Sequence, residues 1–362
     1  MSHVVNSLSF ISSHWLAWKV VGSAHAEPSN GFYVLYAIIF HLVVSVSFPL
    51  HLGATLFNNN NITDDMKNLT LFVVTLSCSL KGAFYGYNLQ KVRHMEQLLR
   101  LLDSRVDSAQ RSICDQLRKK LGFIIYGFMG ICVCVTISAE MSFFFQKQRK
   151  LLYPAWFPFD WHNSSRNYYL AHAYQIVGVS LQVLQNYASD CFPAVMLCII
   201  SAQTQMLYNR IENIGMAQES AQDSEVDLEA CITDHKHLLE QFVASALNIC
   251  ISIASVVFYV TEPLTRAYFF FYALAMPLQI FPTCYYSTDL ELSMGKLNYA
   301  AFSCNWLSQR RSFKRKQMLF VERSLKQKSA KAGGMLLIHL NTFMGTLKFA
   351  YSLFTIILRL RK

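Results

Sequence analysis

Seven long runs that contain almost no charged residue dominate this sequence. Each run reaches the roughly 20 residues that an α-helix needs to cross the hydrocarbon core of a bilayer. A globular core does not need seven such runs separated by polar segments, so the sequence predicts an all-α membrane protein with seven transmembrane helices. The runs are Gly31–Leu52, Asn68–Gln90, Leu121–Gln146, Asn167–Asn209, Gln241–Thr261, Ala267–Thr288 and Ala332–Leu358.

The composition excludes other classes of protein. Hydrophobic residues make up 53% of the chain and charged residues only 15%, whereas about 25% of the residues in a soluble domain are charged. This much hydrophobicity also excludes intrinsic disorder. No P-loop, G-x-G-x-x-G, H-E-x-x-H or C-x-x-C motif occurs, so we expect no enzymatic activity, metal or cofactor.

The basic residues predict the orientation in the membrane. With the N-terminus in the cytoplasm, 21 Lys and Arg residues lie on the cytoplasmic side and nine on the other, as the positive-inside rule requires. Eighteen of them fall in residues 91–120 and 289–331, so the net charge of +10 anchors a membrane protein and predicts no nucleic-acid partner. We expect no cleaved signal peptide, because the first long apolar run is a full span.

Three N-x-Ser/Thr sequons are consistent with this orientation. Asn61, Asn68 and Asn163 all precede or begin a run that enters from the outside, so all three are candidate glycosylation sites. The C-terminus is then extracellular. This topology is the reverse of that of G-protein-coupled receptors, and none of the ten cysteines is placed for an extracellular disulfide.

Several motifs recur in order along the chain. Cys284–Ser287 ends the sixth run, Leu297–Phe302 is followed by Trp306, and Ala350–Thr355 lies in the seventh run. A leucine-rich segment, Leu98–Asp103, follows the second run. This series resembles the insect odorant receptors, with specific motifs confined to about residues 284–358.

The resemblance implies a function and a division of the chain. Such receptors are ligand-gated, non-selective cation channels that form heterotetramers with an obligate co-receptor in the plasma membrane of olfactory neuron dendrites. Residues 1–289 would form a six-helix bundle that binds a small volatile odorant in its outer half. Residues 290–335 would form a cytoplasmic anchor, and residues 336–362 the pore-lining seventh span with a short extracellular tail.

The seventh run contains the candidate gate. Phe354 and Leu358 are four residues apart and share one helical face, and an apolar ring can close a pore by dewetting. Tyr351, Ser352 and Thr355 complete the predicted pore segment, where the small hydroxyls would ease hydration of the open pore. The alternative is that these residues pack on lipid or neighbouring helices and bond to their own backbone.

The candidate ligand pocket is drawn from the outer halves of the spans. An aromatic and apolar cavity with few polar groups suits a small volatile ligand, although helix packing alone would also explain each of these residues. The candidates are Phe72, Thr75, Leu76, Thr136, Glu140, Phe144, Tyr169, His172, Gln175 and Tyr268.

Besides Glu140, three charged residues lie within predicted spans. Lys81, Asp190 and Lys348 each cost free energy in hydrocarbon and therefore need water or a partner. Lys81 and Asp190 can pair if their depths match, and Lys348 would oppose cation flow if it faced the pore.

Other functions remain open at this stage. A gustatory receptor of the same superfamily would have the same topology and a tastant as its ligand. A metabotropic seven-helix receptor is disfavoured by the orientation, and a transporter by the lack of an inverted repeat.

Overall fold

The computed structural model describes nine segments of the chain, residues 7–24, 31–55, 62–106, 110–144, 151–216, 222–239, 266–326, 329–332 and 336–348. Side chains are described within them except at 7–8, 62–67, 70, 138–144, 266–278 and 331–336. The predicted fifth run, Gln241–Thr261, therefore lies outside the described residues.

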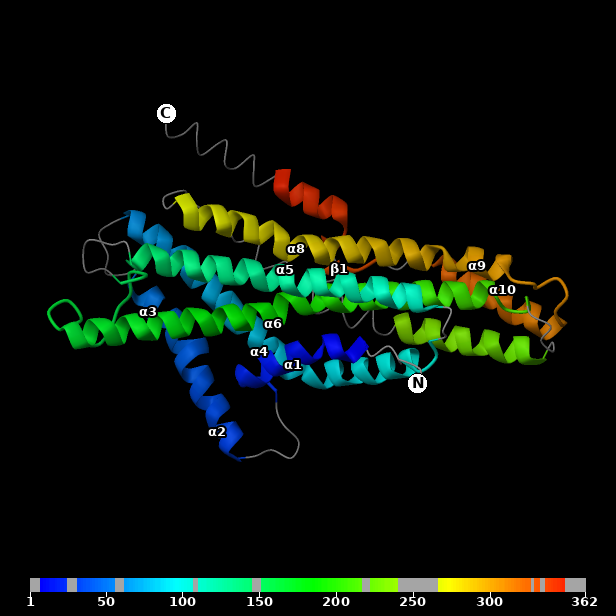
Figure 1. Cartoon of the computed structure of the whole chain (residues 1–362), viewed down its shortest axis with the longest axis horizontal. Helices are drawn as coiled ribbons and strands as arrows, with labels where there is room; N and C mark the ends of the chain where they lie inside the picture. Colours follow the sequence, from blue (N-terminus) through cyan, green and yellow to red (C-terminus); the bar gives the residue numbers. More distant parts are fainter. Residues whose placement is uncertain are drawn as a thin grey trace.

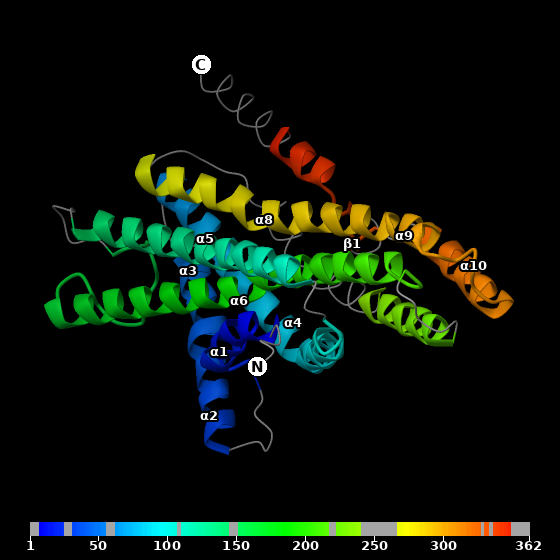
Figure 2. The same cartoon turned by 45° about the vertical axis from the view of Figure 1, so that its right-hand side comes forward.

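Four long helices form the body of the molecule. They are α4 (Ile62–Asp103), α5 (Arg111–Phe144), α6 (Ser165–Glu212) and α8 (Arg266–Gly295). Helices α5, α6 and α8 run side by side along the long axis in both views (Figures 1 and 2). The 48 residues of α6 span about 72 Å at 1.5 Å per residue. This exceeds the roughly 30 Å hydrocarbon core, so α6 extends beyond the membrane, as the fourth run predicts.

Three of the described helices are long and apolar enough to cross a membrane. They cover Gly31–Thr55, Arg111–Ile137 and Ser165–Glu212. The C-terminal half of α6 is buried on all sides, with the residues from Tyr187 to Thr204 inaccessible to solvent. A helix that is apolar all round belongs in the centre of a bundle, and α6 is that central helix.

The first span contains a π-helical segment. It consists of α2 (Gly31–Phe40), the π-helix η2 (His41–Val46) and α3 (Ser47–Thr55). A π-helical turn changes the hydrogen bonding of the backbone carbonyls. Two carbonyls of η2 accept hydrogen bonds from side chains of α6. The Tyr174 hydroxyl donates to the Val43 carbonyl at 3.1 Å, and the Gln182 amide donates to the Val44 carbonyl at 2.9 Å. These two bonds fix the first span against α6.

A short N-terminal helix packs into the bundle. It follows a 3-10 turn, η1 (Ser7–Phe10), and forms α1 (Ser12–Val20). His14 and Trp18 of α1 are almost completely buried, and the Trp18 ring lies 5.0 Å from Phe192 of α6. The sequence did not predict this burial.

A second group of helices gathers at the C-terminal end of α6 (Figure 2). It contains α9 (Leu297–Ser303), α10 (Arg311–Leu325) and the helix of residues 222–239. Buried Asp234 pairs with Arg210 of α6 at 2.7 Å and with Arg105 beyond the end of α4. Lys316 of α10 pairs with Glu225 and Glu229.

The last described helix begins later than the sequence predicts. Instead of a helix from Ala332 or residue 336, the chain forms two short antiparallel strands, β1 (Lys331–Ala332) and β2 (Leu336–Leu337), and the helix starts at residue 340. The glycine pair at 333–334 disfavours helix here. The predicted start of the seventh span is therefore wrong by several residues.

Side chains of α8 hold this segment in place. The buried Ser287 hydroxyl donates to the Ile338 carbonyl at 2.8 Å. The Leu340 amide donates to the Thr288 hydroxyl at 3.1 Å, which satisfies one of the free amides at a helix start. Ser287 of the Cys284–Ser287 motif and the adjacent Thr288 thus fix the position at which the last helix begins.

Candidate functional site

A groove of about 250 Å³ lies between α5 and α6. Its lining residues recur at spacings of three and four on each helix, so each helix contributes one face. We call this cavity the α5–α6 groove. Its lining residues are Met129, Cys132, Val133, Thr136 and Ile137 of α5, with Ser180, Val183, Leu184 and Tyr187 of α6.

The chemistry of the α5–α6 groove is mainly apolar. The Thr136 hydroxyl is engaged, because it donates to the Cys132 carbonyl at 3.0 Å. The hydroxyl of Tyr187 lies 3.0 Å from that of Ser13 in α1. Val133 and Ile137 are half exposed, so the groove opens along α5. Its size is near the lower end of the range for small-molecule pockets.

A buried ion pair lies one helical turn below the groove. Asp190 follows Tyr187 by three residues on α6, and Lys81 of α4 donates to both of its carboxylate oxygens at 2.9 and 3.0 Å. Both side chains are about 5% exposed. The Tyr85 hydroxyl adds a bond to the Ser189 carbonyl at 3.0 Å. This is the pairing that the sequence left open.

Among the sequence-predicted ligand residues whose side chains the structure describes, only Thr136 lines the α5–α6 groove. Phe72 instead packs in an aromatic cluster around Phe48, beside the 151–164 loop. Gln175 bonds through its amide to both backbone groups of Tyr153, at 3.3 and 2.8 Å. These contacts explain Phe72 and Gln175 as packing residues that fix the 151–164 loop.

The remaining predicted ligand residues fall into three groups. Thr75 is buried and donates to the Phe72 carbonyl, and His172 is also buried. Leu76 and Tyr169 are exposed. The other three lie on helices where side chains are not described, namely Glu140, Phe144 and Tyr268.

The other predicted sites are placed as follows. Asn163 is exposed, whereas Asn68 is fully buried. Lys348 ends the described helix of residues 340–348 with an exposed side chain. Asn61 lies outside the described residues. So do the five predicted pore residues, Tyr351, Ser352, Phe354, Thr355 and Leu358.

Sequence reasoning missed eight of the nine groove residues. Met129, Cys132 and Val133 sit in a helix that is apolar on nearly every face, so hydrophobic periodicity cannot separate a cavity face from a lipid face. The sequence signal that could have identified these residues is the recurrence of small and medium side chains at helical spacing on both helices, such as Cys132 on α5 and Ser180 on α6. It becomes informative only once the two helices are known to be neighbours.

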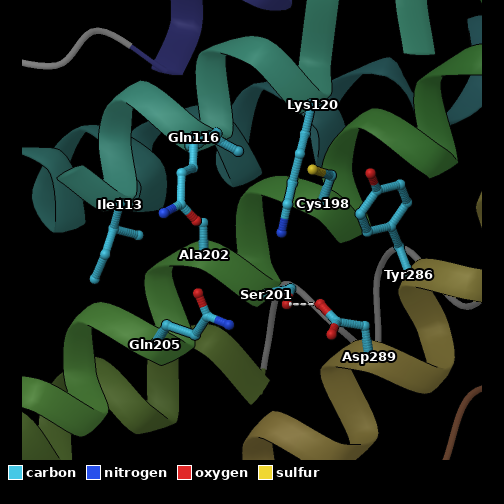
Figure 3. Close-up of a pocket in the computed structure, with 10 residues that line it drawn as sticks. Ile113, Gln116, Lys120, Cys198, Ser201, Ala202, Gln205, Tyr286 and Asp289 are labelled. Carbon is cyan, nitrogen blue, oxygen red and sulfur yellow. Dashed lines mark hydrogen bonds between the residues drawn. The ribbon is translucent and has the colours of Figure 1, made fainter. Parts of the chain in front are cut away.

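A second, polar pocket lies between the N-terminal part of α5 and the C-terminal parts of α6 and α8 (Figure 3). Lys120 of α5 points toward Ser201 of α6, whose hydroxyl donates to the Asp289 carboxylate of α8. The cavity measures about 10 Å³, which is space for one water molecule. It is too small for an organic ligand, and its hydrogen bond joins α6 to α8.

Comparisons with known proteins agree on one family. The family model described as "7tm Odorant receptor" matches residues 61–351. Odorant receptor 59a of Drosophila melanogaster is 53% identical, over 99% of this chain and 99% of its own length. Odorant receptor 33b of the same organism is 32% identical over 99% and 98% of the two chains.

Solved structures agree on the fold. The insect olfactory receptor OR5 from Machilis hrabei aligns with a TM-score of 0.75, covering 97% of this chain and 98% of that chain at 13% identity. The same receptor in complex with eugenol aligns with a TM-score of 0.74. The fold is therefore the all-α, seven-helix fold of a membrane receptor, as the charge-free runs predict. The chain belongs to the insect odorant receptor family, as a tuning receptor and not an enzyme.

Proposed function

We propose that this chain binds a small volatile odorant in the α5–α6 groove and thereby gates a non-selective cation channel. It would act in a heterotetramer with a co-receptor subunit, in the plasma membrane of olfactory neuron dendrites. The observation that carries the proposal is an apolar groove of odorant size between two helices of an odorant receptor. The Machilis hrabei receptor, which has the same fold, has been solved with eugenol.

Burial of apolar surface would dominate the affinity. An odorant that buries roughly 200 Å², about as much as one aromatic side chain, gains about 5 kcal/mol at 25 cal/mol per Å². Loss of translational freedom reduces this gain, so we expect affinities weaker than micromolar. Such weak binding permits fast release, which suits a sensor of changing odour concentration.

A continuous set of contacts joins the groove to the last helix. Tyr187 lines the groove on α6, Ser201 of the same helix bonds to Asp289 of α8, and Ser287 of α8 bonds to the Ile338 carbonyl. Movement of α6 on odorant binding would therefore reach the start of the helix at residue 340. Phe354 and Leu358, farther along the chain, would form the apolar gate, with Tyr351, Ser352 and Thr355 beside it.

Apolar side chains on α9, on α10 and on the segment between them support the proposed anchor. Tyr299, Phe302, Leu307 and Met318 are each more than half exposed, at the end of the bundle remote from the groove. Exposed apolar patches of this kind mark interaction surfaces. We propose that residues 290–335 contact neighbouring subunits there. The bundle within residues 1–289 would then carry the ligand site, and residues 336–362 the pore.

A matched pair of substitutions tests the ligand site. Cys132 lines the groove, whereas Cys134 is exposed and does not line it. Cys132→Trp fills the groove, so we expect it to abolish odorant-evoked current when the chain is expressed with a co-receptor and tested on an odorant panel. Cys134→Trp should respond like the unmodified chain. Full odorant sensitivity in Cys132→Trp, at equal surface expression, would rule out the groove.

The same cells test the channel mechanism. We expect odorant-evoked current to persist in excised patches without nucleotides, because gating needs only the ligand and the subunits. Current that requires guanine nucleotide would instead support a metabotropic receptor. Full-length similarity to named odorant receptors does not favour the gustatory alternative.

A further inference from the structure

Tyr187 connects the α5–α6 groove to the N-terminal helix. Its ring lines the groove and is only 3% exposed. Its hydroxyl lies 3.0 Å from the hydroxyl of Ser13, which is not a lining residue. The groove therefore borders the aromatic ring, while the polar atom of the same side chain is engaged by α1.

The position of Ser13 is fixed by the packing of α1. The His14 ring stacks on Tyr187 with centroids 5.0 Å apart. Trp18, one turn later, stacks on Tyr85 of α4 at 5.6 Å. The indole of Trp15 donates to Glu96 of α4. Three aromatic side chains thus hold α1 between α4 and α6, and Ser13 is presented to Tyr187 by a rigid element.

We propose that Ser13 sets the selectivity of the groove between apolar and hydroxyl-bearing odorants by engaging the Tyr187 hydroxyl. This inference rests on the proposed function, because it requires odorants to bind in the groove. While Ser13 holds the phenol, an odorant meets only the ring edge and face of Tyr187. An odorant hydroxyl then loses hydrogen bonds to water without gaining one from Tyr187, and this shifts the selectivity of the groove toward apolar ligands.

Removal of the Ser13 hydroxyl should shift the preference of the groove from apolar odorants toward hydroxyl-bearing odorants. In Ser13→Ala the Tyr187 hydroxyl loses its partner, and a buried unpaired hydroxyl is unfavourable. A ligand hydroxyl can then replace the lost serine. One neutral hydrogen bond changes an equilibrium by about two- to tenfold, so the affinity ratio between a hydroxyl-bearing probe and its hydrocarbon isostere should rise by about that factor.

The test measures binding of two probes of equal size, 2-phenylethanol and propylbenzene. The full chain in complex with its co-receptor is purified, and the ligand-dependent rise in melting temperature is titrated for each probe. Any rise in melting temperature that persists in Cys132→Trp reflects binding outside the groove and is subtracted. We expect Ser13→Ala to raise the preference for 2-phenylethanol about two- to tenfold, and Ser13→Thr, which keeps the hydroxyl, to restore the original ratio.

Two further variants separate selectivity from general damage. Tyr187→Phe removes the phenol, so Ser13→Ala in that background should no longer change the ratio. Ser12→Ala is the matched control, because Ser12 is exposed and its hydroxyl donates to the Ser9 carbonyl. An unchanged ratio in Ser13→Ala overturns the proposal, as does an equal loss of both probes or the lack of any groove-dependent shift. Loss of odorant-evoked current in Cys132→Trp would still support the groove, so the two failures are distinguishable.

Discussion

The ion pair between Lys81 and Asp190 places two opposite charges where neither is open to solvent. Each charge alone would cost several kcal/mol in this position. Lys81 approaches both carboxylate oxygens, so the two charges compensate each other directly. Because α4 and α6 each supply one partner, the pair also fixes the relative height of the two helices immediately below the groove.

Removal of one partner should be far more harmful than removal of both. Lys81→Met leaves an uncompensated buried carboxylate, and such changes cost about 3–5 kcal/mol. In the double variant Lys81→Met with Asp190→Leu no charge remains, so we expect most of the stability to return. The measurement is the melting temperature of the purified chain, with exposed Lys19→Met as the control. A double variant no more stable than Lys81→Met would contradict this account.

At the scale of elements, close approach of helices depends on a few glycines. A Cβ atom added to Gly178 of α6 would lie 2.3 Å from the ring of Phe48 in α3, which is fully buried and cannot retreat. A Cβ atom on Gly127 of α5 would meet nothing within 4 Å. Both glycines lie inside helices, so the same substitution should have opposite effects.

Gly178→Ala should destabilise the protein by about 1–3 kcal/mol through overpacking. Gly127→Ala should stabilise it by up to about 1 kcal/mol, because alanine favours helix. Thermal unfolding of the two variants shows whether stability falls in Gly178→Ala and rises in Gly127→Ala. Adding Phe48→Leu should restore the stability that Gly178→Ala loses. Equal effects of the two alanines would show that packing at Gly178 is looser than the structure indicates.

The contact between the 222–239 helix and α10 should depend on pH. Hydrogen bonds from Lys316 and Ser312 lower the pKa of Glu225 below its ordinary value of 4.5. A carboxyl whose pKa is lower in the folded state stabilises the fold above its unfolded pKa and loses that effect as the pH falls through the folded value. The contribution is therefore complete at neutral pH and disappears only in acid below about pH 4.

Glu225→Gln provides the test of this pH dependence. The difference in melting temperature between the unmodified chain and Glu225→Gln should be constant from pH 7 to pH 5 and shrink below about pH 4. Lys316→Met, which removes the partner, should show the same trend. A difference that grows in acid would contradict the sign of the pKa shift.

The helices were largely predictable from the sequence, because lipid and protein interior both select apolar side chains. The limit of that signal is visible at α4, which continues from Gln90 to Asp103 through charged residues that hydropathy assigns to a loop. It is visible again at Trp18, whose burial depends on contacts with α4 and α6 that no local pattern encodes. Fold class follows from local composition, whereas docking of α1 follows from tertiary packing.

The ligand site was less predictable for a related reason. The groove depends on which face of α5 meets α6, and both helices are apolar around most of their circumference. Thr136 was predicted because it lies in the half of the third span that the charge pattern places outside. Leu184 and Val183 were not, since nothing distinguishes them in sequence from exposed apolar residues such as Val177.

For the whole molecule, the sequons test the proposed orientation. Asn163 is exposed in the 151–164 loop, and its amide donates to Asp160 at 2.7 Å. Asn68 is fully buried within α4, so the folded structure leaves no room for a glycan there. If the 151–164 loop is extracellular, Asn163 is the better acceptor.

Variants that each keep one sequon should separate these sites. We expect the variant that keeps only Asn163 to carry a glycan that a glycosidase removes, and the variant that keeps only Asn68 to carry none. Gel mobility before and after glycosidase treatment measures this. An unmodified Asn163 together with a modified Asn68 would contradict both the burial of Asn68 and the accessibility of the loop.

The burial of α1 also constrains how the protein is made. Ser13 and Tyr187 are 174 residues apart in the chain, and at about 5–20 residues per second the ribosome needs roughly 10–35 s to join them. During that interval α1 is complete, but the surface of α6 that will hold it has not been synthesised. Nascent chains arrested before the fourth span must therefore expose the sides of His14 and Trp18 that later pack on Tyr187 and Phe192 of α6. That exposed aromatic face would let cellular quality control tell an unfinished receptor from a finished one.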